Sequence, residues 1–407
     1  MAVDIRNLLG TIHHHIKLNL YRWMLPIKIK SIRKKNIITV LYVLSELSSW
    51  KTEMLFQAMM RHHRFHPIIG VSSLPNRPEV KQQLVDYLLI KGYEYVDLDA
   101  KKNSIKIINP DLITYHKPYG CYSEGHYYKD NLQYVFFGLN YGFAIAKNPV
   151  HQSHAMFDYC WQFYVENAEV AAWKKKVLGY RANNVCVTGV PMQDALLENK
   201  ESFDDPWIDK TGKKRIIYAP HHSIKGTNGE GVELSTFLDF GEPLLEFAKK
   251  YCNDITIAFK PHPNLYSKLV AIWGQERTDS YYSTWKTLPN TLLVLGEYMG
   301  LFKYSDAIIH DSASFLLEYL YMNNPSMYLV IGEEDTITDG MYDYVKRAFD
   351  CYEKGHRKDE IESFIHNIIQ GKDINKVERG SFVKAYLLPP GGKTACSNII
   401  DSLLGVS

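Results

Sequence analysis

Several patterns that would assign a chain to a familiar class are missing from this sequence of 407 residues. It has no run of about 18 or more apolar residues, so we expect no membrane-spanning helix. The N-terminus lacks the compact apolar core of a secretory signal, so we expect no such signal. The six cysteines form no C-x-x-C pair, which predicts reduced thiols in a cytosolic protein rather than disulfides or a zinc site.

The sequence also lacks an excess of charge of either sign. The formal net charge is +2, so composition implies no general affinity for polyanions and we predict no nucleic-acid partner. No G-x-G-x-x-G follows the first predicted strand, which excludes the usual NAD fingerprint. Tyrosine, in contrast, is frequent, with 29 residues; such residues suit cores, sugar-facing pockets and interfaces.

Residues 1–35 form a basic segment in which Asp4 is the sole acidic residue. Apolar and aromatic residues alternate with the lysines and arginines, a mixture that suits an anionic membrane surface. The alternative is a helix packed on the adjacent domain with its lysines solvated. We expect Pro26 to interrupt any long helix here. The resulting prediction is a cytoplasmic protein bound peripherally to the inner face of the cell membrane.

The first domain is predicted to cover residues 36–200. Its first strand, at 36–44, is a continuous apolar run, the kind found in parallel sheets covered on both faces. Further short strands are predicted at 67–71, 95–98, 111–115 and 134–137. They alternate with helices at 48–64 and 78–91. This alternation predicts βαβ crossovers and a Rossmann-like sheet.

Polar residues follow the later strands of this domain. His116 follows one strand and Tyr141 the next, and both loops are candidates for the acceptor side of a cleft. The alternative is that these loops satisfy only their own backbone groups. Gly189 lies in a Gly-x-Pro turn, where glycine freedom and a fixed proline φ have a structural purpose.

The second domain is predicted at 213–385, with residues 386–407 as a helix that crosses back to the first domain. Three of its predicted strands run into polar residues: 215–220 into His221 and His222, 255–259 into Lys260 and His262, and 304–309 into Asp311, Ser312 and Ser314. Ligands of open α/β sheets bind outside the carboxyl ends of the strands, so these ends could face one pocket. Ser312 and Ser314 suit helix capping, and the same N–H groups could hold a diphosphate.

Four segments in order resemble the CDP-glycerol:poly(glycerophosphate) glycerophosphotransferase family of teichoic-acid and capsule synthesis. They are Val187–Asp194, Ile217–Pro220, Phe259–Pro263 and Ser305–Ser314, the last followed by Glu318, Tyr319 and Pro325. The resemblance implies a GT-B-like α/β fold, with two Rossmann-like domains facing a central cleft and a nucleotide held mainly by the C-terminal domain. The family usually has threonine and an aromatic residue where this chain has His221 and His222.

The reaction that the resemblance implies is transfer of a polyol phosphate from a CDP-alcohol to a hydroxyl of a cell-surface glycan or lipid-linked acceptor, with release of CMP. We predict catalytic roles for His262, His116 and His222, with His262 meeting the diphosphate near its normal pKa range. No metal and no cofactor other than the donor substrate is predicted. The predicted substrate contacts are Lys260, Asp311, Ser312, Ser314, Glu318, Tyr218, His221, Tyr141 and Gly189.

Two other functions fit the same sequence. One is a GT-B glycosyltransferase that uses a nucleotide-sugar donor in capsule or lipopolysaccharide synthesis. The other is an inactive GT-B scaffold. The alcohol on the donor, the acceptor, single addition against polymerisation, the catalytic base (His116, His221 or His222) and the oligomeric state stay open.

Overall fold

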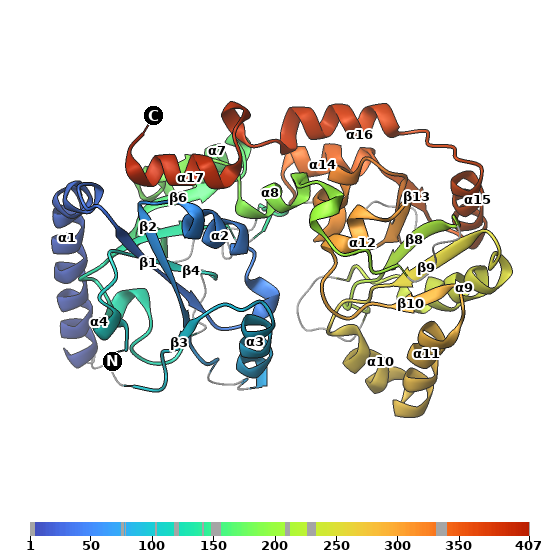
Figure 1. Cartoon of the computed structure of the whole chain (residues 1–407), viewed down its shortest axis with the longest axis horizontal. Coiled ribbons are helices and arrows are strands. Elements are labelled where there is room, and N and C mark those ends of the chain that lie inside the picture. Colours follow the sequence, from blue (N-terminus) through green and yellow to red (C-terminus); the bar gives the residue numbers. More distant parts are fainter. Residues whose placement is uncertain are drawn as a thin grey trace. The chain divides into compact units, whose positions relative to one another are not determined.

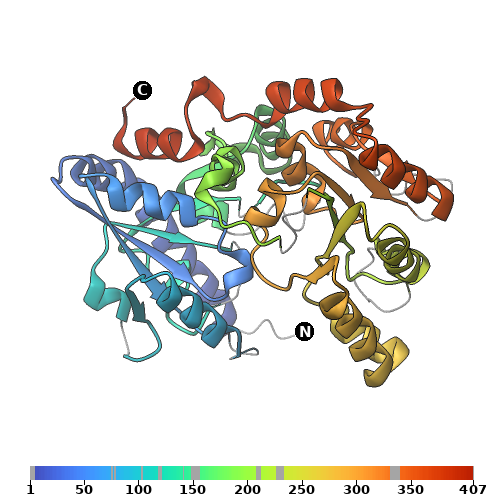
Figure 2. The same ribbon diagram turned by 45° about the vertical axis from the view of Figure 1, so that its right-hand side comes forward.

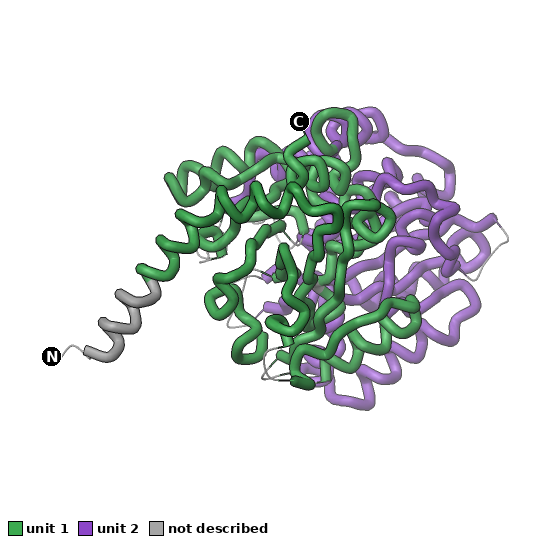
Figure 3. The backbone as a smooth tube through the Cα atoms, turned by 60° about the vertical axis from the view of Figure 1, so that its left-hand side comes forward, with its two compact units in different colours: residues 1–194, 389–407 green, residues 195–388 purple. Residues whose placement is uncertain are grey.

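The computed structural model of the chain describes residues 5–74, 77, 79–101, 104–117, 122–140, 142–147, 156–207, 212–225, 233–330 and 340–406. The chain divides into two compact units (Figure 3). Unit 1 comprises residues 1–194 and 389–407, and unit 2 comprises residues 195–388. The domain limits predicted from the sequence were 200 and 385.

Unit 1 is built on a seven-stranded sheet in the order β3-β2-β1-β4-β5-β6-β7 (Figure 1). All neighbouring strands are parallel. The strands are β1 (Ile38–Leu44), β2 (Phe65–Val71), β3 (Tyr95–Asp97), β4 (Leu112–Tyr115), β5 (Val135–Leu139), β6 (Cys160–Val165) and β7 (Val185–Val187). β1 is almost wholly buried because helices cover both faces, as its continuous apolar sequence predicted. β6 was not predicted as a strand.

The helices of unit 1 are α1 (Ile5–Arg33), α2 (Glu53–Arg61), α3 (Glu79–Ile90), α4 (Ser104–Ile108), α6 (Met156–Tyr159), α7 (Ala168–Leu178) and α17 (Ala395–Leu404). Helix α8 (Pro191–Leu197) begins in unit 1 and ends in unit 2. The C-terminal helix α17 packs against α2. Its first turn is held by Asp194, whose carboxylate accepts hydrogen bonds from the backbone N–H groups of Ala395 at 2.7 Å and Cys396 at 2.8 Å. These bonds satisfy N–H groups that a helix start otherwise leaves unpaired.

Helix α1 corrects one expectation, because it continues through Pro26 to Arg33. Tertiary contacts hold it against β5 and the end of α6. The Tyr21 hydroxyl donates to the carbonyl oxygen of Tyr159 at 2.8 Å, and Arg22 pairs with Asp158 at 3.0 Å. The loss of one backbone donor at a proline is therefore tolerated, since packing of the buried face stabilises the helix on both sides of it.

Unit 2 is built on a six-stranded sheet in the order β10-β9-β8-β11-β12-β13. All neighbouring strands are parallel. The strands are β8 (Lys214–Ala219), β9 (Ile255–Phe259), β10 (Thr291–Leu293), β11 (Ala307–His310), β12 (Ser326–Leu329) and β13 (Glu353–Gly355). β11 starts later than predicted, because residues 304–306 form the turn and bend that follow the helix at 299–303.

The helices of unit 2 are α9 (Phe237–Lys250), α10 (Leu265–Trp273), α11 (Gln275–Thr287), α12 (Met299–Lys303), α13 (Phe315–Glu318), α14 (Asp343–Asp350), α15 (Lys358–Ile369) and α16 (Lys376–Phe382). α10 and α11 lie side by side near β10 (Figure 2). α13 has four residues and continues as a 3-10 turn.

The strand order of each sheet reverses at one point. In unit 1 the reversal lies between β1 and β4, and in unit 2 between β8 and β11. Such switch points open a crevice at the carboxyl ends of the strands, where open α/β sheets bind ligands. The residues after β8, β9 and β11 are therefore the first place to look for a site. Within the described part of the chain, no helix combines the length and the apolar character needed to span a bilayer.

Candidate functional site

Three histidines come together at the carboxyl ends of β8 and β9. The ring centroids of His221 and His222 are 4.4 Å apart, and those of His221 and His262 are 5.1 Å apart. His222 and His262 stack, with centroids 4.0 Å apart and an interplanar angle of 28°. All three side chains are half-buried. We call this group the histidine cluster.

Backbone pairing beyond the strand ends explains why the cluster forms. The N–H of Lys260 donates to the carbonyl oxygen of Tyr218 at 2.8 Å, and the N–H of His262 donates to that of Pro220 at 3.0 Å. The ladder between β8 and β9 thus continues into the two loops. Because parallel strands of one sheet end at the same edge, the polar residues after each strand meet there.

Asp311 holds the loop of His221 from the neighbouring strand β11. One carboxylate oxygen accepts the backbone N–H of His221 at 2.5 Å. The other accepts the backbone N–H of Thr236 at 2.6 Å and the Thr236 hydroxyl at 2.9 Å. Burial raises the pKa of Asp311 to about 6, although these hydrogen bonds favour the charged form. The geometry gives Asp311 a positioning role, and its direct contact with substrate stays a prediction.

The electrostatics of the cluster differ from the expectation of a histidine near its normal pKa. Burial lowers the pKa of His262 to about 4, with further lowering by His222 and Lys260. Burial likewise lowers the pKa of His221 to about 3, followed by the effects of His222 and His262. His221 and His262 are therefore neutral at pH 7. Burial is the main cause, because it disfavours the charged form of an imidazole; the neighbouring rings and, for His262, Lys260 add smaller effects.

The tautomer of His262 follows from its local hydrogen bond. The backbone N–H of Asn264 donates to Nδ1 of His262 at 3.1 Å. Nδ1 is then the acceptor, so the neutral ring carries its proton on Nε2. Lys260, two residues earlier, is buried, with 6% of its surface exposed, and its charge acts on His262. The site thus offers a fixed N–H donor beside a buried cation.

Ser312 and Ser314 follow β11, and the structure narrows what they can do. The N–H of Ser312 donates to Nδ1 of His310 at 3.2 Å, so this amide is already engaged. Ser314 is the N-cap residue of α13 but makes no side-chain capping bond. With four residues, α13 is too short for a strong helix dipole. Contact of either serine with a donor stays a prediction.

Two other predicted contacts of unit 2 lie inside the fold. Glu318 is 3% exposed and accepts a hydrogen bond from the Tyr298 hydroxyl at 2.6 Å. Tyr218 is fully buried in the hydrophobic core, where its ring stacks on Phe259 with centroids 5.6 Å apart. The structure does not bring Tyr218 to the cluster, because alternate residues of a strand point to opposite faces and its side chain faces the core.

The predicted residues of unit 1 are partly described. His116 follows β4 and is 2% exposed; its Nε2 lies 3.3 Å from the Ser45 hydroxyl and its Nδ1 lies 3.0 Å from the Tyr122 hydroxyl. Burial lowers its pKa to about 4, so it is neutral at pH 7. These contacts place His116 at the switch point of unit 1. Its role as the base stays a prediction, and Tyr141 lies outside the described residues.

Gly189 occupies a tight turn with φ of +83°. A Cβ atom there would lie 2.8 Å from Cβ of Ala395 and 2.8 Å from Oε1 of Gln193. Glycine is therefore required by both the backbone conformation and the space, as the turn chemistry predicted. Its substrate contact stays a prediction.

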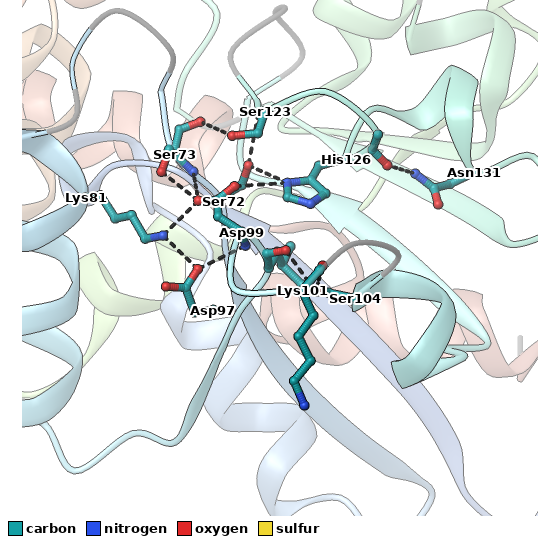
Figure 4. A network of polar contacts seen from close by, with 12 residues as sticks. Ser72, Ser73, Lys81, Asp97, Asp99, Lys101, Ser104, Ser123, His126 and Asn131 are labelled. Carbon is teal, nitrogen blue, oxygen red and sulfur yellow. Dashed lines mark hydrogen bonds and ion pairs between the residues drawn. The ribbon is translucent and has the colours of Figure 1, made fainter.

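A polar network that the sequence analysis did not identify lies after β2 and β3 of unit 1 (Figure 4). Lys81 of α3 pairs with Asp97 and Asp99, each at 2.7 Å. Asp99 also accepts the Ser73 hydroxyl at 2.6 Å, and the Ser72 hydroxyl lies 2.9 Å from Nδ1 of His126. Burial opposes the ionised form of Asp99, but hydrogen bonds from Lys81 and the serines lower its pKa to about 2. No motif marked these residues, since they come from four separate segments.

Comparison with known protein families assigns the chain to one of them. The model of the CDP-glycerol:poly(glycerophosphate) glycerophosphotransferase family matches residues 140–386, which is more than half of the sequence and includes the histidine cluster. The chain belongs to this family. The resemblance inferred from the four segments is thereby confirmed.

Two curated relatives from Staphylococcus aureus match part of this family member. The teichoic acid ribitol-phosphate polymerase TarK is 27% identical over 183 residues, which cover 43% of this chain and 33% of TarK. The ribitol-phosphate polymerase TarL is 26% identical over 183 residues, which cover 43% of this chain and 30% of TarL. The matched region spans about a third of the length of these relatives.

Solved structures support the fold assignment over nearly the whole chain. The wall teichoic acid polymerase TagF aligns with a TM-score of 0.58 at 13% identity, covering 99% of this chain and 98% of the TagF chain. A UDP-GlcNAc 2-epimerase from Neisseria meningitidis aligns with a TM-score of 0.56 at 15% identity, covering 90% of this chain and 100% of that chain. At such identities the likeness concerns the fold, and it confirms the predicted GT-B-like class of two Rossmann-like units.

Proposed function

We propose that this family member transfers a polyol phosphate, such as glycerol phosphate or ribitol phosphate, from a CDP-alcohol to an acceptor hydroxyl and releases CMP. The observation that carries the proposal is the convergence of His221, His222 and His262 beside the buried Lys260 at the strand ends of unit 2. The family match and the names of the curated relatives support the class of reaction. The acceptor is a cell-surface glycan or a lipid-linked precursor.

The charges at the cluster suit a nucleotide diphosphate. Lys260 supplies a cation, and Nε2 of His262 supplies an N–H donor whose direction is fixed by Asn264. The nearby carboxylate of Asp311 is directed at the backbone of His221 and at Thr236, so it is engaged by donors of the protein. Donors held in a partly buried site stabilise phosphate oxygens more strongly than donors in water do.

The transfer step follows from this arrangement. The acceptor oxygen attacks the β-phosphorus of the CDP-alcohol, and the bond from that phosphorus to the bridging oxygen breaks. The bridging oxygen leaves with CMP and takes the developing negative charge. Lys260 and the N–H of His262 stabilise that charge, and the approach of the diphosphate raises the pKa of His262 toward protonation. The acceptor proton passes to a base or to solvent.

A donor screen tests the reaction class. The full chain is incubated separately with CDP-glycerol, CDP-ribitol and UDP-GlcNAc in the presence of a bacterial lipid extract, and mass spectrometry identifies the nucleotide released. We expect CMP from a CDP-alcohol. Release of CDP or UDP would instead establish the alternative, a glycosyltransferase, and no release above a protein-free control with any donor would support an inactive scaffold.

We further propose that α1 binds unit 1 to an anionic membrane surface. The helix is apolar on two opposite faces. One face carries Leu18, Tyr21 and Ile32, which are buried against the unit. The opposite face carries Ile16, Leu20, Trp23 and Ile27, which are 54–72% exposed. Because these residues recur every three or four positions, they form one stripe along the helix.

The charge around this stripe supports a lipid partner. Lys30 and Lys34 continue the same face toward the C-terminal end of α1 and are exposed. A shallow hollow of about 670 Å³ beside them is lined by a mixture of basic and apolar residues: Arg22, Leu25, Pro26, Ile29, Lys30, Arg33, Lys34 and Trp161. Apolar side chains flanked by lysines are what an anionic bilayer surface attracts. The alternative considered from the sequence, a helix packed on the adjacent domain, applies to the opposite face of α1, which carries Leu18, Tyr21 and Ile32.

A further inference from the structure

The histidine cluster has a second property besides its donor capacity. One ring nitrogen from each of His221, His222 and His262 lies within 4.8 Å of the other two, and among the described residues this group could hold a metal ion. The sequence analysis predicted no metal, and His262 lies about forty residues from the other two histidines along the chain. Only the pairing of β8 with β9 creates the set.

The distances are close to those of a metal site. A tetrahedral zinc ion with bonds of about 2.1 Å holds neighbouring ligand nitrogens roughly 3.4 Å apart. The ring nitrogens of the cluster are at most 4.8 Å apart. Side-chain rotations that move each nitrogen by about 1 Å are enough to bring the three to the spacing of zinc ligands. All three rings are half-buried, which leaves an entry path for the ion while limiting competing water.

Neighbouring groups orient the first ligand. Oγ of Ser223 lies 2.7 Å from Nδ1 of His221 and also accepts the N–H of Leu234 at 3.0 Å. The backbone N–H of Ser223 donates to the same Nδ1 at 3.2 Å, so without an ion the His221 ring carries its proton on Nε2. Binding of an ion at Nε2 shifts the proton to Nδ1, where Oγ of Ser223 is placed to accept it. Histidine ligands of metal ions usually have such a partner on their second nitrogen, which fixes both the ring and the tautomer.

His262 needs the same change of tautomer as His221. The N–H of Asn264 donates to its Nδ1 at 3.1 Å, so Nε2 carries the proton when no ion is bound. Binding of an ion at Nε2 displaces that proton, the ring changes tautomer and the bond from Asn264 is lost. Proton release on metal binding is general for imidazole ligands. Nε2 of His262 therefore either donates a hydrogen bond to an anion or, once deprotonated, ligates a cation.

We propose that His221, His222 and His262 bind one divalent transition-metal ion of the zinc class, with an open fourth position that takes a phosphate oxygen of the donor. Three protein ligands and one open position are typical of catalytic rather than structural zinc sites, and imidazole favours zinc, copper, nickel or iron over magnesium. The role of the fourth position, binding a phosphate oxygen of the donor, rests on the proposed function. When bound, the ion polarises the phosphate and neutralises its charge, the role that the N–H of His262 has when no ion is present.

Ion binding is measured first, without nucleotide. The full chain is stripped with EDTA, desalted and titrated with ZnCl₂ by calorimetry and with CoCl₂ by visible absorption. We expect saturation at one ion per chain and the intense absorption of tetrahedral cobalt. His222→Ala removes a ligand and should weaken binding more than about 100-fold. Ser223→Ala removes only a hydroxyl that orients His221 and should weaken binding about tenfold. His366→Ala, a change at an exposed histidine of the same unit, should leave the affinity unchanged.

X-ray absorption of the zinc-loaded wild type keeps the test independent of how the variants fold. We expect three imidazole nitrogens at about 2.0–2.1 Å. Absence of saturable binding, fewer than three imidazoles, or an equal loss of affinity in His366→Ala would each overturn the site.

The fourth position is tested by adding CDP to the cobalt-loaded chain. We expect the cobalt bands to shift as a phosphate oxygen replaces water. Unshifted bands under conditions where calorimetry shows CDP bound would overturn the open-position role while leaving the ion site. If ion binding fails but a CDP-alcohol still yields CMP, the metal inference falls and the proposed function stands. If the ion binds but neither CDP binding nor CMP release occurs, the proposed function falls and the ion site stands.

Discussion

Asp311 fixes the backbone of His221 across the switch point of unit 2. Its carboxylate, at the end of β11, accepts the N–H of His221 after β8 at 2.5 Å, and it holds Thr236 before α9 with its other oxygen. One buried side chain thus ties together three segments around the histidine cluster. The position of His221 consequently depends on a residue that need not touch substrate itself.

Replacement of Asp311 should therefore affect stability as well as the site. Asp311→Ala leaves the part-buried N–H of His221 and the buried N–H of Thr236 without their acceptor, and each orphaned buried group costs about 1–3 kcal/mol. We expect a loss of about 2–5 kcal/mol in urea unfolding, together with weaker CDP binding. Asp311→Asn keeps one acceptor oxygen and should lie between wild type and Asp311→Ala. Wild-type stability in Asp311→Ala would contradict the positioning role.

His262 is expected to contribute directly to the reaction. His262→Ala removes an N–H donor from the proposed diphosphate site, and loss of one such donor typically lowers the rate about 100- to 1,000-fold. CMP release from the active CDP-alcohol is the measurement. His262→Gln retains an N–H donor and should recover part of the rate, whereas His366→Ala serves as the unaffected control. A rate for His262→Ala within about threefold of wild type would argue against a catalytic role.

His310 should make the protein sensitive to acid. It is fully buried, and burial lowers its pKa to about 3 from an ordinary value of 6.5. The unfolded chain binds this proton below pH 6.5 while the folded chain does not, so stability is present above 6.5 and falls as the pH drops toward 3. The slope is about 1.4 kcal/mol per pH unit for one such group.

Variants at this position separate titration from packing. His310→Phe and His310→Gln both remove the titrating group, and both should reduce the slope of unfolding free energy against pH between about 6 and 4 by the same amount. Their absolute stabilities should differ, because only Gln is polar in a buried site. An unchanged slope in both would show that acid sensitivity originates elsewhere.

The exposed stripe of α1 predicts vesicle binding that depends on apolar contact. Trp23→Ser with Ile27→Ser removes two exposed apolar side chains, each worth about 1.5–3 kcal/mol on full burial. We expect co-sedimentation with vesicles containing phosphatidylglycerol to fall at least about tenfold. The matched control is Leu89→Ser with Ile90→Ser, two exposed apolar residues of α3 in the same unit. Equal loss in both double variants would contradict a specific role of α1.

Lys81 is expected to stabilise unit 1 through its two carboxylates. In Lys81→Met the hydrogen bonds to Asp97 and Asp99 are lost, and charge-assisted bonds of this kind contribute about 1.5–3 kcal/mol when buried and less when part-exposed. We expect a loss of about 1–2 kcal/mol at pH 7 in urea unfolding. The effect should shrink as the pH falls from about 4 toward 2, because the pKa of Asp99 is about 2 in the folded state and protonation there removes its charge. A pH-independent loss would point to packing alone.

Much of the fold was predictable because its signals are local. Continuous apolar runs such as 38–44 and 255–259 are buried on both faces of parallel sheets, and that environment requires no information from distant residues. β6 escaped prediction because Gln162 interrupts the apolar run in its sequence. The predicted helix break at Pro26 was wrong for the opposite reason. Proline locally disfavours a helix, but contacts of Tyr21 and Arg22 with distant residues keep α1 continuous.

The candidate site was predictable only in part, for the same reason. Polar residues after strands identified His221, His222, Lys260 and His262 individually. Whether a strand-end residue faces the core or the crevice depends on the register and on the last turn of the backbone, so the sequence did not reveal that the Tyr218 ring packs in the core. Its contact with substrate stays a prediction. The network of Lys81, Asp99 and His126 left no local signal, since each member comes from a different segment.

The sequence by itself determined the class of this protein: its order of strands and helices, its family and the residue types available for binding a diphosphate. Those properties depend on short-range periodicity and on motifs that are contiguous in the chain. Only the tertiary structure decided that three histidines share one place, that Asp311 is engaged in holding His221, and that α1 keeps a second apolar face exposed. Each of these depends on strand pairing or helix packing between residues far apart in sequence, which no local pattern specifies.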